Sequence, residues 1–462
     1  MNGFSFPFPF FPVQFTKDGF LFQQSDSDAL MRGIQAGVTD LFVMSHGWNN
    51  NMDDAQGLYS GLSTQLAAQI AAAAPLKGRT FAICGVLWPS KQFDERDLIP
   101  GGAASLNDAV TEDGMRARVS SLADLIQARG WPMEAPDNAA QSKLDAVMQS
   151  VDDWADDPGV RNFVVTSIRE LLPQSSADAE DASGRFFALT PELLLENLSR
   201  TLNPPLNLTS GTNASSVDPY AGGSASGLGG AASFRDVLGG VQASLLHFLN
   251  FTTYYLMKAR AGDVGVKGVA PLIQAVRGAH PGLRMHLIGH SFGCRLATAA
   301  VNALPDSGQL RPNTMTLLQG AFSHNGFAEK FDDVNDGAFR PVVARKKVRG
   351  PILITHTRND KAVGVAYPIA SRIAGQTAAA LGDENDIYGG LGSNGAQNQT
   401  TTPERVVGTL LDVGGSYPFA GGATSSRPYN LLADAFIAGH SDIVKPQVAY
   451  AVAVALATPD AA

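Results

Sequence analysis

The stretch that decides the fold lies in the second half of the chain and reads Met285-His286-Leu287-Ile288-Gly289-His290-Ser291-Phe292-Gly293-Cys294-Arg295-Leu296-Ala297. The apolar run from Leu283 to Ile288 predicts a buried strand, and the small residues after Gly293 predict a helix. Between them, the sequence Gly-His-Ser-Phe-Gly predicts a tight strand-to-helix turn with Ser291 at its tip.

A turn of this kind suits nucleophilic chemistry. A serine hydroxyl reacts poorly unless it projects clear of the sheet beside a base. Gly289 and Gly293 let strand and helix approach closely, because neither carries a Cβ atom. The helix that follows directs its positive N-terminal end toward an oxyanion formed at Ser291. The pattern G-x-S-x-G is common by chance, but its place between a strand and a helix makes Ser291 a candidate nucleophile.

The rest of the chain predicts a parallel sheet around this strand. Apolar runs at 41–44 and 81–87 flank a helical segment at 53–74, and this order of strand, helix and strand is typical of an α/β sheet. Further strands are expected at 314–318, 352–355 and 429–433, and further helices at 236–260, 266–278, 297–304 and 362–380. The sequence therefore predicts an α/β protein.

These patterns divide the chain into three parts. Residues 1–90 hold the first part of the sheet and begin with a β-hairpin, which Asp18-Gly19 between two short apolar runs predicts. Residues 91–235 form a mainly helical insertion. Residues 236–462 hold the second part of the sheet, including Ser291.

The insertion is expected to combine helices with loosely packed links. Helices are expected at 104–128, 138–156 and 159–172, and a further one opens with Thr190 as cap and Pro191 at its first position. The segments 175–183 and 204–233 lack apolar periodicity, so we expect both to be mobile and to be cut first in limited proteolysis. Residues 383–425 read as a second long loop.

On the turn at Ser291 and the elements around it, the chain resembles the α/β-hydrolase superfamily, and within it the esterase- and lipase-like serine hydrolases. The resemblance covers roughly residues 9–90 and 236–455. It implies a mostly parallel central sheet with helices on both faces and a triad in the chain order Ser, then Asp or Glu, then His.

Two later residues match this order. Asp360 follows the apolar strand at 352–355, where the family places its acid, and His440 is the only histidine after His356. The resemblance therefore implies that His440 accepts the proton of Ser291 and that Asp360 orients its imidazole. Other interpretations stay open, since Asp360 also suits a helix cap and His440 a surface position. Alternative acids follow the preceding strand: Asp332, Asp333 and Asp336.

An oxyanion site has its own signal at the end of the strand at 41–44. His46-Gly47-Trp48 resembles the His-Gly-X oxyanion loop of the family and implies the N–H groups of Trp48 and Phe292 as the two donors. The residues expected to line the substrate pocket are His46, Gly47, Asn49 and His290. A structural role for His46 is equally compatible with the family pattern.

Composition excludes several classes of function. The net charge of −9 argues against a nucleic-acid partner, whose phosphates require basic surfaces. The two cysteines, Cys84 and Cys294, read as free buried thiols and favour a reducing, cytoplasmic compartment. The N-terminus lacks a signal-peptide pattern, and the apolar segment 241–257 contains too many polar residues for a membrane span.

No cofactor or metal is expected. The sequence contains no zinc motif, and the calcium-like run 332–337 has the wrong ligand spacing. It also lacks the glycine patterns that bind nucleotides. The sequence leaves open whether the protein contacts a membrane and whether it forms oligomers.

Two classes of function compete. The favoured one is an intracellular serine hydrolase that cleaves small-molecule or lipid acyl esters through an acyl-enzyme, and a peptidase or amidase would use the same triad. The other is a non-catalytic binding or scaffold protein with the same fold. The presence of Ser291, Asp360 and His440 together favours the enzyme, because a scaffold requires none of them.

Overall fold

The chain is described by a computed structural model, which defines the conformation of most of its residues. The described residues are 3–35, 37–48, 50–90, 112–128, 137–199, 240–360, 362–363, 370, 373–374, 386–398, 405–419 and 426–458. The chain divides into two compact units. Unit 1 comprises Met1–Ser90, Arg260–Val363 and Gly390–Ala462, and unit 2 comprises Lys91–Ala259 and Gly364–Gly389.

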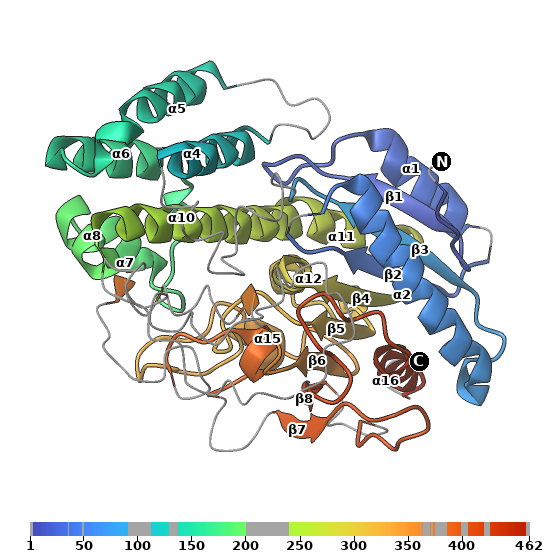
Figure 1. Ribbon diagram of the computed structural model, residues 1–462. Coiled ribbons are helices and arrows are strands. Elements are labelled where there is room, and N and C mark those ends of the chain that lie inside the picture. The colour runs from blue at the N-terminus through green and yellow to red at the C-terminus, as the bar shows by residue number, and fades with distance from the viewer. Residues whose placement is uncertain are drawn as a thin grey trace. The chain divides into compact units, whose positions relative to one another are not determined.

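Unit 1 is built on one sheet of eight parallel strands in the order β1-β3-β2-β4-β5-β6-β8-β7 (Figure 1). The strands are β1 (Phe10–Gln14), β2 (Asp40–Ser45), β3 (Phe81–Leu87), β4 (Arg284–His290), β5 (Thr314–Leu318), β6 (Ile352–His356), β7 (Val406–Thr409) and β8 (Pro428–Leu432). The central strands are buried along almost their whole length, which explains why they appear in the sequence as continuous apolar runs. The predicted α/β class is confirmed.

Helices cover the sheet of unit 1. They are α1 (Gln24–Ile34), α2 (Met52–Ala72), α11 (Ala270–Ala279), α12 (Phe292–Ala303), α13 (Arg340–Ala344), α15 (Leu391–Asn394) and α16 (Pro446–Leu456), with a π-helical segment at Val264–Val269 and short 3-10 turns at Ala74–Leu76 and Gly308–Leu310. Helices α2 and α16 pack against each other, whereas α12 packs against β4 and the π-helical segment (Figure 1). Asn51 and Asp54 cap α2 reciprocally, each side chain accepting from the other's backbone N–H.

Two segments of unit 1 differ from the sequence-based expectations. In the expected N-terminal hairpin, the chain reverses after Thr16 and forms a single antiparallel bridge between Phe15 and Leu21, but only the first arm becomes a strand. That strand, β1, pairs in parallel with β3 at the end of the sheet, and the reversing segment adds to β1 only the backbone bond from the N–H of Phe22 to the carbonyl of Gln14. The expected loop at 383–425 contains helix α15 and strand β7.

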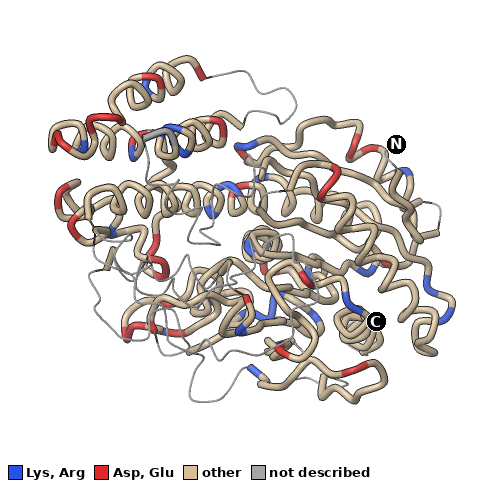
Figure 2. The backbone as a smooth tube through the Cα atoms, in the orientation of Figure 1, with Lys and Arg blue, Asp and Glu red and all other residues tan. Residues whose placement is uncertain are grey.

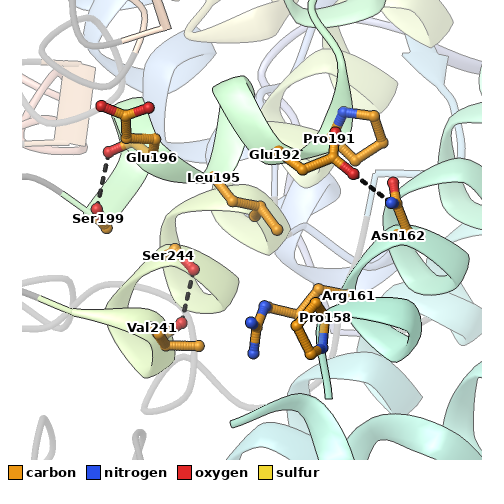
Figure 3. A pocket seen from close by; sticks show the side chains of 10 residues that line it. All are labelled: Pro158, Arg161, Asn162, Pro191, Glu192, Leu195, Glu196, Ser199, Val241 and Ser244. Carbon is orange, nitrogen blue, oxygen red and sulfur yellow. Dashed lines mark hydrogen bonds between the residues drawn. The ribbon is translucent and has the colours of Figure 1, made fainter. Parts of the chain in front are cut away.

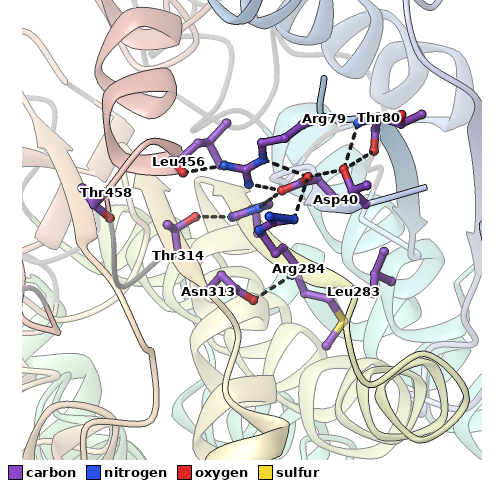
Figure 4. A network of polar contacts seen from close by, with 12 residues as sticks. Asp40, Arg79, Thr80, Leu283, Arg284, Asn313, Thr314, Leu456 and Thr458 are labelled. Atoms are coloured by element: carbon purple, nitrogen blue, oxygen red, sulfur yellow. Dashed lines mark hydrogen bonds and ion pairs between the residues drawn. The ribbon is translucent and has the colours of Figure 1, made fainter. Parts of the chain in front are cut away.

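A buried ionic network lies at the amino edge of the sheet, where β2, β4 and β5 begin (Figure 4). The carboxylate of Asp40 pairs with the guanidinium of Arg79 and accepts from Nε2 of His286 at 3.0 Å. Arg79 also donates to the carbonyl of Leu456 in α16, and Thr314 Oγ1 lies 2.9 Å from Nδ1 of His286. These bonds connect the starts of three strands with a helix that lies far away in the sequence.

Unit 2 contains helices in its described part. They are α4 (Glu112–Gln127), α5 (Asn138–Ser150), α6 (Pro158–Glu170), α7 (Ser183–Ala188), α8 (Pro191–Ser199) and the unit-2 part of α10 (Val241–Asp263), with 3-10 turns at Val151–Trp154 and Gln174–Ser176. A cavity of about 250 Å³ lies between α6, α8 and the start of α10 (Figure 3), and Arg161 and Glu192 are among its lining residues. The expected flexible segment 204–233 lies outside the described residues.

The other expected link, 175–183, is packed. Lys258 Nζ forms ion pairs with Asp178 at 2.6 Å and with Asp181 at 2.7 Å, and the side chains of Lys258 and Asp181 are almost fully buried. Ser183 donates from its backbone N–H to Asp181. The expectation of a loose link at 175–183 is therefore wrong: polar residues without apolar periodicity are held here by a buried lysine from a distant helix.

Three further observations concern the cysteines, the hydrophobicity of the helices and the distribution of charge. Both cysteines are free and buried, as predicted. In the described ranges, no helix combines the length and the apolar composition that crossing a membrane requires. Figure 2 shows Lys and Arg interspersed with Asp and Glu along the described helices and strands.

Candidate active site

Ser291 lies at a turn between strand β4 and helix α12, where the sequence predicts one, and its backbone is strained. Ser291 adopts φ +56° and ψ −124°, a region that residues with a side chain rarely occupy. Its N–H donates to the carbonyl of Leu318 at the end of β5, and its carbonyl accepts from Cys294 in α12 and from Ala321. Backbone hydrogen bonds to α12, to the end of β5 and to the residues that follow β5 therefore hold the strained residue in place.

The glycines of the turn are required by close contacts. A Cβ atom at Gly289 would collide with the carbonyl of Gly293, and one at Gly293 would collide with the carbonyl of Ser45 at the end of β2. The pattern G-x-S-x-G thus reflects how tightly β4, α12 and β2 converge at Ser291.

Asp360 and His440 meet at the carboxyl edge of the same sheet. Nδ1 of His440 lies 2.8 Å from Oδ2 of Asp360, whose side chain is fully buried. The other carboxylate oxygen of Asp360 accepts from the N–H of Val363 at 3.0 Å. Asp360 follows β6 and His440 follows β8, and these strands are neighbours in the sheet. The two residues are 80 positions apart in sequence, and strand pairing brings them together.

A second set of contacts, which sequence analysis missed, joins the two loops that carry this pair. Oδ1 of Asp434 accepts from Thr357 Oγ1 at 2.8 Å and from the N–H of Arg358 at 2.9 Å. Asn359 Nδ2 donates to the carbonyl of Ile437 at 2.9 Å. The sequence gives only a weak signal for these contacts. It shows polar residues after the strands that become β6 and β8, but it does not show that these strands pair.

His290 connects the turn at Ser291 with the loop of His440. Nε2 of His290 lies 3.0 Å from the main-chain carbonyl of His440, and the two imidazole rings are 5.0 Å apart. Among the described residues, no hydrogen bond joins Ser291 Oγ to His440. The structure thus places the serine, the histidine and the aspartate at one edge, with the Asp–His contact formed.

The loop after β2 lies directly against Ser291. A Cβ atom at Gly47 would collide with Cβ of Ser291 and would lie 3.0 Å from its Oγ. The next residue, Trp48, packs its ring edge-on against Phe292 at a centroid distance of 6.4 Å. Trp48 and Phe292, the two expected oxyanion donors, therefore flank the serine.

His46 is buried beside the loop that carries Gly47 and Trp48. Its Nε2 accepts from the N–H of Trp88 at 3.3 Å, its Nδ1 lies 2.9 Å from the carbonyl of Gly47, and its ring stacks on Trp88. Burial lowers the pKa of His46 to about 4, so the ring is neutral at physiological pH. Of the two roles expected for His46, this position corresponds to the structural one. Asn50 adds a bond from Nδ2 to the carbonyl of Trp48, and Asn49 lies outside the described residues.

The alternative acids lie in a separate loop. Asp332 accepts from the N–H groups of Val334 and Asn335, and Asp336 accepts from the N–H of Lys330. Asp333 is exposed. These bonds are local to the loop, whereas Asp360 contacts the imidazole directly, so the geometry selects Asp360 as the partner of His440.

The described residues contain no group of three or more His, Cys, Asp or Glu side chains arranged to hold a metal ion. What the arrangement offers is a serine at a strained turn, an Asp–His pair and a glycine loop against the serine. Comparison with known proteins gives no match: no family model, no curated protein and no solved structure matches this chain.

Proposed function

We propose that this protein is a serine hydrolase of the α/β-hydrolase fold that cleaves carboxylic esters through an acyl-enzyme on Ser291. The observation that carries the proposal is the 2.8 Å contact between Asp360 and His440, formed at the sheet edge where Ser291 occupies its strained turn. A serine, a histidine and an aspartate in this arrangement can act together as a catalytic triad. A scaffold protein gains nothing from the strained backbone of Ser291.

The order of the strands supports the fold. The strand with the nucleophile, β4, lies in the middle of the sheet between β2 and β5, and all strands are parallel. The loops after β2, β4, β6 and β8 therefore open at one edge and carry, in turn, Gly47, Ser291, Asp360 and His440. Ligands of open α/β sheets bind at this carboxyl edge.

The proposed reaction follows from the groups present. Asp360 accepts a hydrogen bond from Nδ1–H of His440, which leaves Nε2 free to take the proton of Ser291. Ser291 Oγ attacks the carbonyl carbon of the ester and forms a tetrahedral intermediate. Its oxyanion accepts from the N–H groups of Trp48 and Phe292, each worth on the order of 10²–10³ in rate.

The intermediate then collapses. The bond from carbon to the leaving oxygen breaks, and His440 returns the proton to the departing alcohol. His440 then takes a proton from water, whose oxygen attacks the acyl carbon; the bond from that carbon to Ser291 Oγ breaks, Oγ receives the proton from His440, and the carboxylic acid leaves. The contact between Ser291 and His440 forms on substrate binding in this scheme, since catalytic hydrogen bonds are often long before substrate is bound.

A fluorophosphonate probe tests the proposal, because it reacts covalently with activated serines. We expect the wild-type protein to be labelled at Ser291, and Ser291→Ala and His440→Ala to remain unlabelled. Ser307→Ala, in the loop after α12, is the matched control and should be labelled like wild type. Absence of labelling in the wild type, or equal labelling of Ser291→Ala, would refute the proposal. Rates of hydrolysis of p-nitrophenyl butyrate and of butyryl p-nitroanilide then compare the cleavage of an ester with that of an amide.

A further inference from the structure

His290 is a buried histidine with an unusual set of contacts. Only 6 % of its surface is exposed, and Nε2 lies 3.0 Å from the carbonyl oxygen of His440. A carbonyl can only accept, so Nε2 carries the hydrogen and Nδ1 carries a lone pair. Among the described residues, Nδ1 has no hydrogen-bond partner. The imidazole of His290 thus makes one hydrogen bond through Nε2, while its Nδ1 is buried without a partner among the described residues.

Filling space in the core does not by itself explain a histidine at position 290. An unsatisfied buried polar atom destabilises a protein, and a phenylalanine ring of similar shape would fill the space without that cost. Burial and the neighbouring His440 lower the pKa of His290 to about 3, so the ring adds no charge beside the base. What the histidine provides and a phenylalanine lacks is the N–H that bonds His440.

We propose that His290 is a positioning residue that ties the loop of the catalytic base to the nucleophile turn through Nε2–H and the carbonyl of His440. This inference rests on the proposed function. His290 directly precedes Ser291, so the bond fixes the main chain of the base relative to the main chain of the nucleophile. Asp360 contacts the imidazole of His440 itself, at Nδ1.

The two contacts have different effects on His440. Asp360 holds the side chain through Nδ1, whereas His290 holds the backbone on which the side chain is mounted. Misplacing a catalytic group by about 1 Å costs on the order of 10²-fold in rate. Losing the bond from His290 should therefore slow the proton transfer and leave substrate binding unchanged.

Two variants separate the hydrogen bond from the ring. His290→Phe keeps a ring of similar size but has no donor. His290→Gln loses the ring but places an amide N–H where Nε2–H was. The control is His280→Phe, because His280 caps the C-terminus of α11 just before β4 begins, at the opposite edge of the sheet. Each purified protein is checked for its melting temperature, its rate of fluorophosphonate labelling, and kcat and KM with p-nitrophenyl butyrate.

We expect His290→Phe to lower kcat and the labelling rate by on the order of 10- to 100-fold with KM unchanged. His290→Gln should recover most of the loss, and His280→Phe should match wild type. A purely structural role would lower the melting temperature without this split between kcat and KM and without rescue by glutamine. Rates of His290→Phe equal to wild type would overturn the inference.

If His290→Phe does not fold, His290→Asn takes its place, because its amide is too short to reach the carbonyl of His440. Labelling faster in the glutamine than in the asparagine variant supports the inference, and equal or slower labelling overturns it. Failure of the proposed function is a distinct result, since the wild-type protein would then not be labelled.

Discussion

At the scale of single residues, the groups proposed to form the active site are held in positions that cost energy. Ser291 occupies a strained backbone conformation, and Asp360 is buried completely. His290 keeps an unpartnered nitrogen within the described structure. Such costs are typical of functional sites, where the surrounding structure determines the geometry of a few residues.

The acid assignment is testable by isosteric substitution. Asp360→Asn removes the charge and puts the imidazole of His440 in the wrong tautomer, so kcat should fall by about 10⁴-fold in an ester assay. Asp333→Asn is the matched control, because Asp333 is exposed at φ +67° and asparagine tolerates that conformation. The assignment to Asp360 is wrong if Asp333→Asn loses activity while Asp360→Asn keeps it.

Gly47 offers a steric test of the loop against the nucleophile. In Gly47→Ala the added methyl group collides with Cβ of Ser291, so the loop must shift and the donors at Trp48 move with it. We expect kcat to fall by on the order of 10²-fold. Gly278→Ala adds the same atom in α11 with nothing within 4 Å and should leave kcat unchanged. Wild-type kcat in Gly47→Ala would show that the loop does not serve the reaction.

At the scale of elements, the site depends on bonds between the loops after β6 and β8. Asp434 provides two of them through one carboxylate oxygen, which accepts from Thr357 and Arg358. An asparagine at this position keeps that oxygen, whereas an alanine loses it. The pair of variants therefore isolates the contribution of one acceptor to the geometry of Asp360 and His440.

We expect Asp434→Ala to lower kcat and to increase hydrogen exchange at the amide of Arg358, because that N–H loses its acceptor. Leaving a donor of this kind unpaired costs about 1–3 kcal/mol when it is buried, and less here since Arg358 is exposed. Asp434→Asn should resemble wild type in both measurements. Equal exchange and equal kcat in the alanine variant would mean that the two loops are held by other contacts.

At the scale of the whole molecule, the opposite edge of the sheet of unit 1 is stabilised by the network around Asp40. Burial of Asp40 by itself raises its pKa, but the hydrogen bonds from Arg79 and His286 outweigh burial and hold the pKa well below its ordinary value. A carboxylate whose pKa is lower in the folded state stabilises the fold above its unfolded pKa, near 3.9. That contribution is lost as the pH falls toward the folded pKa.

Replacing Asp40 should therefore have a pH-dependent effect. Asp40→Asn leaves Arg79 without its buried partner and should cost about 3–5 kcal/mol in the free energy of unfolding at pH 7. The difference from wild type should shrink as the pH falls below about 4, because Asp40 of the unfolded wild-type chain then takes up a proton while folded Asp40 keeps its charge. Urea denaturation at pH 7 and pH 3 measures both values. A difference independent of pH would show that Asp40 is not stabilised as a carboxylate.

Local patterns in the sequence determined much of the fold. Continuous apolar runs predicted six of the strands near their observed bounds, because strands buried on both faces need apolar residues throughout. The turn at Ser291 was also visible, since its glycines, its serine and the flanking strand and helix are adjacent in the chain. In the structure this pattern corresponds to a positive φ at Ser291 and to contacts at Gly289 and Gly293 that leave no room for a Cβ atom.

Contacts between distant segments were decided only by the tertiary structure. The sequence left four candidate acids, and the pairing of β6 with β8 brings Asp360 to His440. Edge strand β7 has only four residues and alternating burial, too short a signal to distinguish from a loop. The roles of His290 and Asp434 come from hydrogen bonds that span 150 and 77 positions. No local pattern carries such information, because the energy of each bond depends on a partner that only folding brings within reach.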